Sequence, residues 1–151
     1  MLNRYIAKTT MVLFSSLVLF SCKKDKEQTR KEKIVGKWQM TAMTETPAQS
    51  DLDGDGTNDS DFYHFFEECE KQFIYEFQSD GTYIEDRSSC SQDPNDQSMS
   101  TWSMNEEQTV LSVYGQVFDI EEIGSATMSF TINTDLNGVN VKQTSVFTKK
   151  E

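Results

Sequence analysis

From Ile34 onward the chain consists of short runs in which apolar and polar side chains alternate. In the clearest run, 126–132 (ATMSFTI), every second residue is apolar. A period of two predicts β-strands with one buried and one solvent-exposed face. Turn residues such as Ser79-Asp80-Gly81 and 135–138 separate the runs, because glycine readily adopts positive φ. The chain is therefore predicted to be all-β.

Eight such runs follow one another along the chain. A long acidic loop from Glu45 to Ser60 separates the first two, and a polar loop occupies 88–100. Closing an antiparallel meander removes its exposed edges, and eight is a common closing number. We predict an eight-stranded antiparallel up-and-down barrel in preference to an open sandwich. Its strands are expected at 34–42, 73–78, 82–87, 102–104, 108–114, 116–123, 126–132 and 139–148.

Aromatic side chains fall mostly on the predicted inner faces. An eight-stranded barrel either fills with side chains or holds one small ligand, and both alternatives remain open here. The segment 62–66 (FYHFF) is apolar where loops are usually polar. It either plugs the barrel mouth or presents a contact surface. Its candidate ligand-binding residues are Phe62, Tyr63, Phe65 and Phe66.

The long loop contains a regular series of acidic residues, 51–61 (DLDGDGTNDSD). Calcium is bound by six to eight oxygen ligands, and an EF-hand loop supplies them at alternate positions with glycine at the sixth. Position 12 is Phe62, where an EF-hand has a bidentate glutamate, so a site here is predicted to be weak. The candidate calcium ligands are Asp51, Asp53, Asp55, Thr57, Asp59 and Asp61.

The N-terminus carries Arg4 and Lys8, followed by a ten-residue apolar stretch at 11–20. Ten helical residues span about 15 Å, which is half of the roughly 30 Å hydrocarbon core of a bilayer. The pattern predicts a secretory signal rather than a membrane-spanning helix. Leu19-Phe20-Ser21-Cys22 resembles the lipobox of bacterial lipoproteins. That resemblance implies cleavage before Cys22 and its acylation, with more than one chain for durable anchoring.

Three segments follow from this interpretation: a signal peptide at 1–21, a lipidated tether at 22–33 and a barrel domain at 34–151. The resemblance places the protein on the outer membrane of a Gram-negative bacterium. The run Lys23-Lys24-Asp25 resembles the surface-export signals of some lipoproteins, which favours the outward face.

Acylation of Cys22 leaves Cys69 and Cys90 as an even pair outside the cytoplasm. A disulfide is the default expectation in an oxidising compartment. The loop of about 20 residues that it closes corresponds to roughly 3 kcal/mol in the chain-entropy model.

The acidic composition limits the classes of partner. The net charge is -11, and removing residues 1–21, which carry Arg4 and Lys8 but no acid, changes it to -13. This balance argues against nucleic-acid binding, which requires a basic footprint. His64 is the only imidazole and has no evident nucleophile nearby in sequence, so we predict no catalytic residue and no catalytic cofactor.

The start Gly36-Lys37-Trp38 resembles the glycine-x-tryptophan opening of lipocalins. That resemblance implies that Trp38 closes the barrel base and that Lys149 or Lys150 packs over it. The chain more closely resembles the lipocalin-like domain of small bacterial lipoproteins, over about residues 33–150. The matching pieces, in order, are Gly36/Trp38, the loop 51–61, Cys69, 77–83, Cys90, Trp102 and 147–149.

Two functional hypotheses remain. The first is a monomeric, membrane-anchored, non-catalytic module that binds a small apolar or amphipathic ligand and, weakly, calcium. The second is a structural or interaction lipoprotein with a filled barrel that contacts another envelope protein or a glycan. The ligand and the protein partner are not identifiable from the residues.

Overall fold

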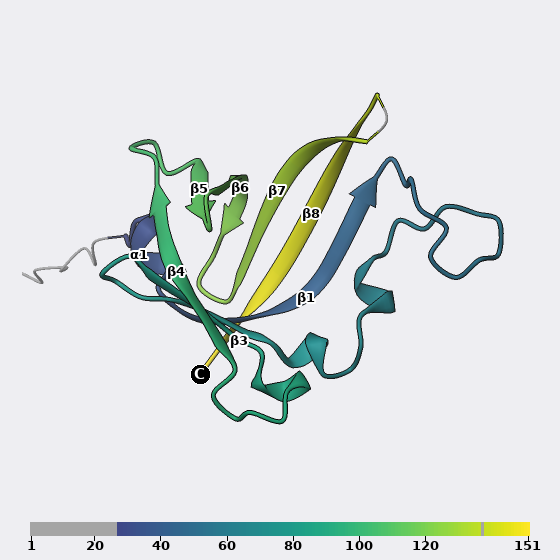
Figure 1. The fold of residues 1–151 in the computed structure, drawn as a ribbon. Helices are drawn as coiled ribbons and strands as arrows, with labels where there is room; N and C mark the ends of the chain where they lie inside the picture. Colours follow the sequence, from purple (N-terminus) through teal and green to yellow (C-terminus); the bar gives the residue numbers. More distant parts are fainter. Residues whose placement is uncertain (1–26, 137) are drawn as a thin grey trace, which may run out of the picture.

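The computed structural model describes residues 27–136 and 138–151 (Figure 1). Within them, eight antiparallel strands form a closed barrel in which each strand pairs with the next and β8 pairs with β1. This confirms the predicted up-and-down barrel and its long loop between the first two strands. The strands are β1 Gly36–Thr46, β2 Ile74–Phe77, β3 Thr82–Asp86, β4 Gln97–Met104, β5 Val110–Val113, β6 Gln116–Ile123, β7 Thr127–Leu136 and β8 Val139–Lys150.

Short helical segments accompany the barrel. The helix α1, Arg30–Ile34, precedes β1, and three 3-10 turns, η1 Tyr63–Phe65, η2 Glu70–Gln72 and η3 Ser88–Cys90, lie in the connections. Thr29 caps α1, since its hydroxyl accepts a hydrogen bond from the Glu32 N–H and the Glu32 carboxylate accepts one from the Thr29 N–H. The last residues of the predicted tether thus belong to α1. Ile34, which was predicted to begin the first strand, also belongs to α1, and β1 begins at Gly36.

Two predicted loop boundaries were wrong. β1 continues to Thr46 because it pairs with β8 over its whole second half, so Glu45 is a strand residue and not the start of the loop. β4 begins at Gln97, inside the predicted loop 88–100, because Gln97 pairs with Asp86 of β3. In both places pairing with a neighbouring strand outweighs the polar composition of the segment.

Two β-bulges change which residues face inward. β1 shifts register between Met40 and Ala42, and β6 shifts between Ile120 and Glu122. A one-residue shift moves all following side chains to the opposite face. As a result Met43 follows Met40 on the inner face of β1 and lines the cavity, in the place where strict alternation would put Ala42.

One end of the barrel is closed by the start of the chain. Trp38 is 0% exposed, and its indole N–H donates a hydrogen bond of 2.6 Å to the carbonyl of Ile34 in α1. The Nζ of Lys149 lies 5.1 Å from the centre of the Trp38 ring and donates to the Lys33 carbonyl. Lys149 therefore takes the position over Trp38 that the lipocalin resemblance implies.

Gly36 is required beside this lysine. Its φ is +129°, and a Cβ atom added there would lie 3.0 Å from the Lys149 Cε. A larger residue would strain the backbone and displace the lysine chain. The glycine-x-tryptophan opening thus has a direct packing reason.

The base is filled by apolar side chains. Trp102 donates its indole N–H to the Gln78 carbonyl at 2.9 Å and packs edge-on against Phe77, with ring centres 5.6 Å apart.

Figure 1 shows α1 and the long β1–β2 loop at opposite sides of the molecule. The buried core residues are Ile34, Trp38, Phe77, Tyr83, Trp102, Leu111, Val113, Ile120, Ile123, Met128, Phe130 and Phe147.

Candidate functional site

Beyond the filled base, the barrel contains a partly open cavity of about 260 Å³. The structure therefore combines the two predicted alternatives, with packed side chains toward α1 and a hollow toward the other end. Residues from seven of the eight strands and the β5–β6 turn line it. They are Met40, Met43, Tyr75, Phe77, Tyr83, Glu85, Leu111, Val113, Tyr114, Gln116, Phe118, Phe130, Gln143, Ser145 and Phe147.

Small residues at inward positions keep this space open. Tyr83 and Glu85 line the cavity, and their direct cross-strand partners on β4 are Ser100 and Ser98. Directly opposite residues share one face of the sheet, so both serines lie on the inner face of β4. On β8, Ser145 lines the cavity opposite Met43 and Phe130. Serine fills too little volume at these positions to close the barrel.

The aromatic walls form contiguous pairs. Tyr75 and Phe147 meet edge-on with ring centres 5.3 Å apart, and Phe130 lies 5.8 Å from Phe147. Across the barrel, Tyr83 meets Tyr114 edge-on at 5.5 Å. Such contacts fix the side chains that shape the cavity.

A few polar groups interrupt this apolar surface. Desolvation raises the pKa of Glu85, although the nearby Arg87 partly offsets the effect. Burial, together with the Glu85 charge, also raises the pKa values of Tyr75 and Tyr83 above the ordinary tyrosine value. Both phenols therefore stay neutral at physiological pH. Glu85 was not predicted from the sequence, because the alternating pattern of a strand does not show which of its residues line a cavity.

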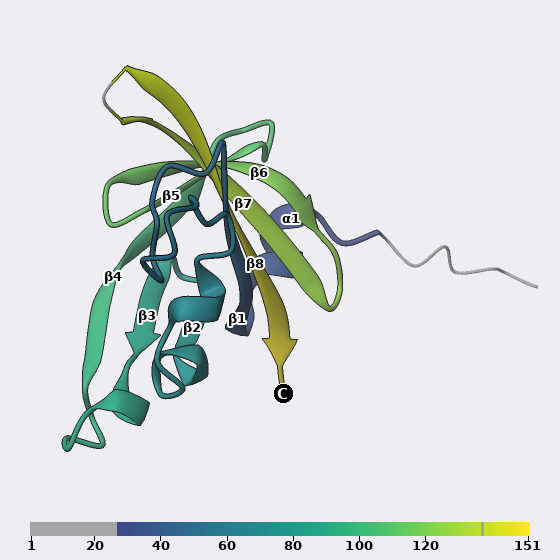
Figure 2. The same cartoon turned by 90° about the vertical axis from the view of Figure 1, so that its right-hand side faces the viewer.

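The predicted ligand-binding residues Phe62, Tyr63, Phe65 and Phe66 do not line the cavity. The segment runs along the edge of β1, where Thr44 pairs with Asp61 and the Phe62 N–H donates to the Met43 carbonyl at 2.9 Å (Figure 2). β2 pairs only with residues 36–38 of β1, which leaves the rest of that edge without a β2 partner. The segment covers this edge instead.

Tyr63 anchors the segment. Its hydroxyl donates a hydrogen bond of 3.0 Å to the Met40 carbonyl, and its ring lies 5.7 Å from that of Phe66. The apolar composition of 62–66 is thus explained by packing on the barrel wall, and Phe65 remains exposed.

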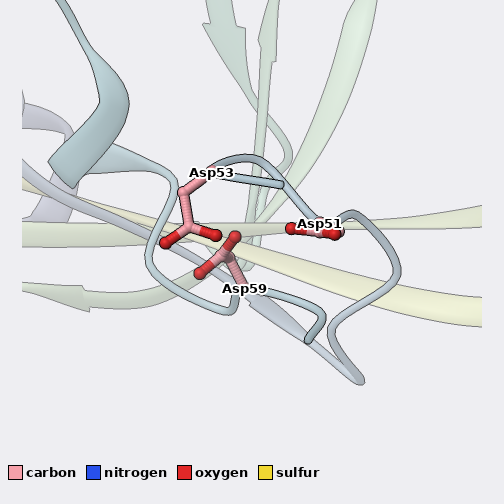
Figure 3. Close-up of side chains that lie close together, drawn as sticks. All are labelled: Asp51, Asp53 and Asp59. Atoms are coloured by element: carbon pink, nitrogen blue, oxygen red, sulfur yellow. The ribbon is translucent and has the colours of Figure 1, made fainter. Parts of the chain in front are cut away.

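The acidic loop brings together three of the six predicted calcium ligands. Ligand oxygens of Asp51, Asp53 and Asp59 all lie within 4.8 Å of one another, near enough to share a metal ion (Figure 3). Asp55 and Thr57 do not join them, since the Asp55 carboxylate accepts the Thr57 N–H at 2.7 Å. Asp61 is likewise separate and accepts the His64 N–H.

Backbone amides shape this cluster. The two Asp51 carboxylate oxygens accept the N–H groups of Gly54 and Gly56 at 2.7 and 2.9 Å. Asp59 accepts the Leu52 N–H at 2.7 Å. The carboxylates hold the loop conformation through these bonds and leave further oxygen lone pairs available.

The predicted disulfide is present. Cys69 and Cys90 are bonded, with their Cα atoms 5.0 Å apart. The bridge joins the connection before β2 to the connection after β3, and the Ser89 hydroxyl donates to the Cys69 carbonyl beside it. It therefore holds together the two segments that flank Tyr75 and Glu85.

The predicted lipid-attachment residue, Cys22, lies outside the described residues. In the part of the chain that is described, no helix has the length and apolar character needed to cross a bilayer.

Comparison with known proteins adds the following findings. Among solved structures, the chain is similar to a bovine odorant binding protein in complex with a selenium-containing odorant, at 16% identity and a TM-score of 0.42. The match covers 85% of this chain and 77% of that one. No curated protein matches the sequence. The family model described as "Domain of unknown function (DUF5004)" matches residues 21–149, so the chain belongs to this family.

Proposed function

We propose that this protein is a membrane-anchored, non-catalytic binding protein whose barrel holds one small apolar or amphipathic molecule. The cavity of about 260 Å³, with aromatic and aliphatic walls and few polar groups, carries the proposal. Ligand sites typically combine mainly apolar walls with a few placed polar groups. A cavity of about 150 Å³ already accommodates benzene, so this one has room for a substituted aromatic ring or a short branched chain.

A cavity-filling substitution tests this proposal. Ser145 lines the cavity, so Ser145→Leu should occupy the ligand volume. Ser112 alternates between the cavity-lining Leu111 and Val113 on β5, so Ser112→Leu is the matched change on the outer face. Native mass spectrometry of the purified protein should show one bound small molecule with wild type and Ser112→Leu, and none with Ser145→Leu. An unliganded mass for all three, with partners recovered only by crosslinking, would favour the structural alternative.

The anchoring part of the proposal is supported by the Leu19-Phe20-Ser21-Cys22 sequence. Six residues lie between Cys22 and Thr29, and the seven residue-to-residue steps span at most about 25 Å when extended. Since Thr29 caps α1 at the closed base, an acyl anchor on Cys22 would hold the base toward the membrane. The cavity would then face away from the lipid.

Anchoring is tested by replacing Cys22 with serine. The intact mass should lose the acyl chains, and the protein should leave the outer-membrane fraction for the soluble one. Unchanged mass and fractionation would refute lipid attachment at Cys22. Protease treatment of whole cells then distinguishes an outward-facing barrel, which is cleaved, from a periplasmic one, which is protected.

Calcium binding to the acidic loop is a second proposal, supported by the convergence of Asp51, Asp53 and Asp59. With a dissociation constant near 1 mM, 10 mM calcium should stabilise the fold by about 1.4 kcal/mol and raise the melting temperature. Asp53→Asn should abolish this gain because it removes one of the three clustered negative charges. The asparagine carbonyl can still accept the Asp55 N–H, so the loop conformation should be kept. Asp80→Asn, in the β2–β3 turn, is the matched control and should keep it. No calorimetric heat and no thermal shift with millimolar calcium would end this proposal.

A further inference from the structure

Resting on the proposed function, we infer that the molecule bound in the barrel carries a cationic ammonium group, and that the Glu85 carboxylate is its counter-ion. Glu85 lines the cavity from β3, directly opposite Tyr75 on β2 and two residues after Tyr83 on its own strand. The side chain therefore presents a carboxylate to a space whose other lining residues carry no formal charge.

No ion pair found within residues 27–136 and 138–151 includes Glu85. The hydrogen bonds found there do not include its carboxylate either. Partial burial without such partners disfavours the charged form of this carboxylate, which is why its pKa is raised. A ligand ammonium beside it would supply both the opposite charge and N–H donors.

Arg87, the residue directly after β3, is the positive side chain whose charge partly offsets the raised pKa of Glu85. Its Nε is buried without a hydrogen-bond partner among the described residues, and its Nη2 contacts other groups. Its Nη2 donates to the Ser98 hydroxyl at 2.9 Å and lies 3.6 Å from an Asp96 carboxylate oxygen. Arg87 also does not line the cavity, whereas Glu85 does. The charge presented to a ligand is therefore negative, which favours a cation over a carboxylate or phosphate.

The remaining groups around Glu85 are neutral at physiological pH. Tyr75 and Tyr83 have raised pKa values and stay protonated. Ser98 faces Glu85 from β4, and Gln143 enters the cavity from β8. These groups offer hydrogen bonds to an ammonium and add no competing charge.

The cavity volume limits the rest of the molecule. About 260 Å³ exceeds the roughly 150 Å³ that holds benzene and lies just below the usual range of ligand pockets. The aromatic and aliphatic walls suit an apolar body of about one ring with a short side chain. Small aryl- or alkylamines have this combination of size and charge.

Three probes of nearly equal size separate the alternatives: 2-phenylethylammonium, neutral 2-phenylethanol and 3-phenylpropionate. Isothermal titration at pH 7 should give the ammonium probe about tenfold or greater affinity over the alcohol, with the carboxylate weakest. Glu85→Gln should remove this advantage while leaving affinity for the alcohol within about twofold. Glu76→Gln, an equal charge change at the β2 residue beside Lys37, is the matched control and should behave as wild type.

The pH dependence provides an independent readout. The ammonium probe stays protonated through the acid range, as lysine does. Any change in its affinity with pH in this range is therefore attributed to the titration of Glu85. Because the Glu85 pKa is raised, affinity for the ammonium probe should fall as the pH drops through that raised value. Glu85→Gln should flatten the profile.

Each outcome is decisive. A carboxylate probe that binds as well as the ammonium probe, or an ammonium affinity unchanged by Glu85→Gln, would overturn the cationic ligand while leaving a binding barrel intact. Failure of all three probes, the neutral alcohol included, would overturn the proposed binding function itself.

Discussion

Replacing Trp38 with alanine is expected to lower the free energy of unfolding by about 3–5 kcal/mol, the usual cost of removing a fully buried aromatic side chain. Trp38 fills the barrel base with 0% exposure, holds α1 through the Ile34 carbonyl and supports the Lys149 chain. The alanine variant leaves a cavity and an unpaired carbonyl. Urea unfolding followed by circular dichroism measures the loss.

Two further variants separate the causes. Trp38→Phe keeps most of the bulk but loses the N–H donor, so it should cost about 1–3 kcal/mol. Val117→Ala, at a residue 57% exposed, should stay within about 0.5 kcal/mol of wild type. A Trp38→Ala protein as stable as Val117→Ala would show that the base does not hold the barrel closed.

Removal of the disulfide is expected to destabilise the fold by about 2–5 kcal/mol, the range for a native bridge in a small secreted domain. The Cys69–Cys90 bond restrains the two connections that flank β2 and β3, which carry Tyr75 and Glu85. The double variant Cys69→Ser/Cys90→Ser avoids an unpaired thiol. Its melting temperature should fall by several degrees, and ligand affinity should fall with it.

The reductant response is the internal control. Dithiothreitol should bring the wild-type melting temperature down to that of the double variant and leave the double variant unchanged. A wild-type protein with the same stability before and after verified reduction would contradict the stabilising role of this bond.

The local pattern of the chain was sufficient to predict the barrel. Alternation and turn residues identified eight strands in the right order, since each strand has one wet and one dry face. The bulges in β1 and β6 could not be predicted from alternation, because a bulge becomes evident only when two strands are placed in register. Ile120 and Ile123 on β6 are both buried although they are three residues apart. This spacing departs from the strand period of two at the position of the β6 bulge.

The candidate site was less predictable. The acidic loop and the cysteine pair stood out by composition, but Glu85 belongs to an ordinary alternating strand. Its significance depends on the cavity that it lines, which becomes evident only in the closed barrel. The segment 62–66 looked like a ligand surface because its covering role on β1 depends on the short length of β2.

Methionine methyl NMR with added 2-phenylethanol tests the central claim, a ligand-binding cavity, most directly. Met40 and Met43 line the cavity, whereas Met99 is 68% exposed on the barrel exterior and Met128 is buried outside the cavity lining. A bound aromatic ring should shift the Met40 and Met43 signals in a saturable way and leave those of Met99 and Met128 nearly unchanged. If the Met40 and Met43 signals do not shift at the highest 2-phenylethanol concentration, or if only the Met99 signal shifts, the account is contradicted.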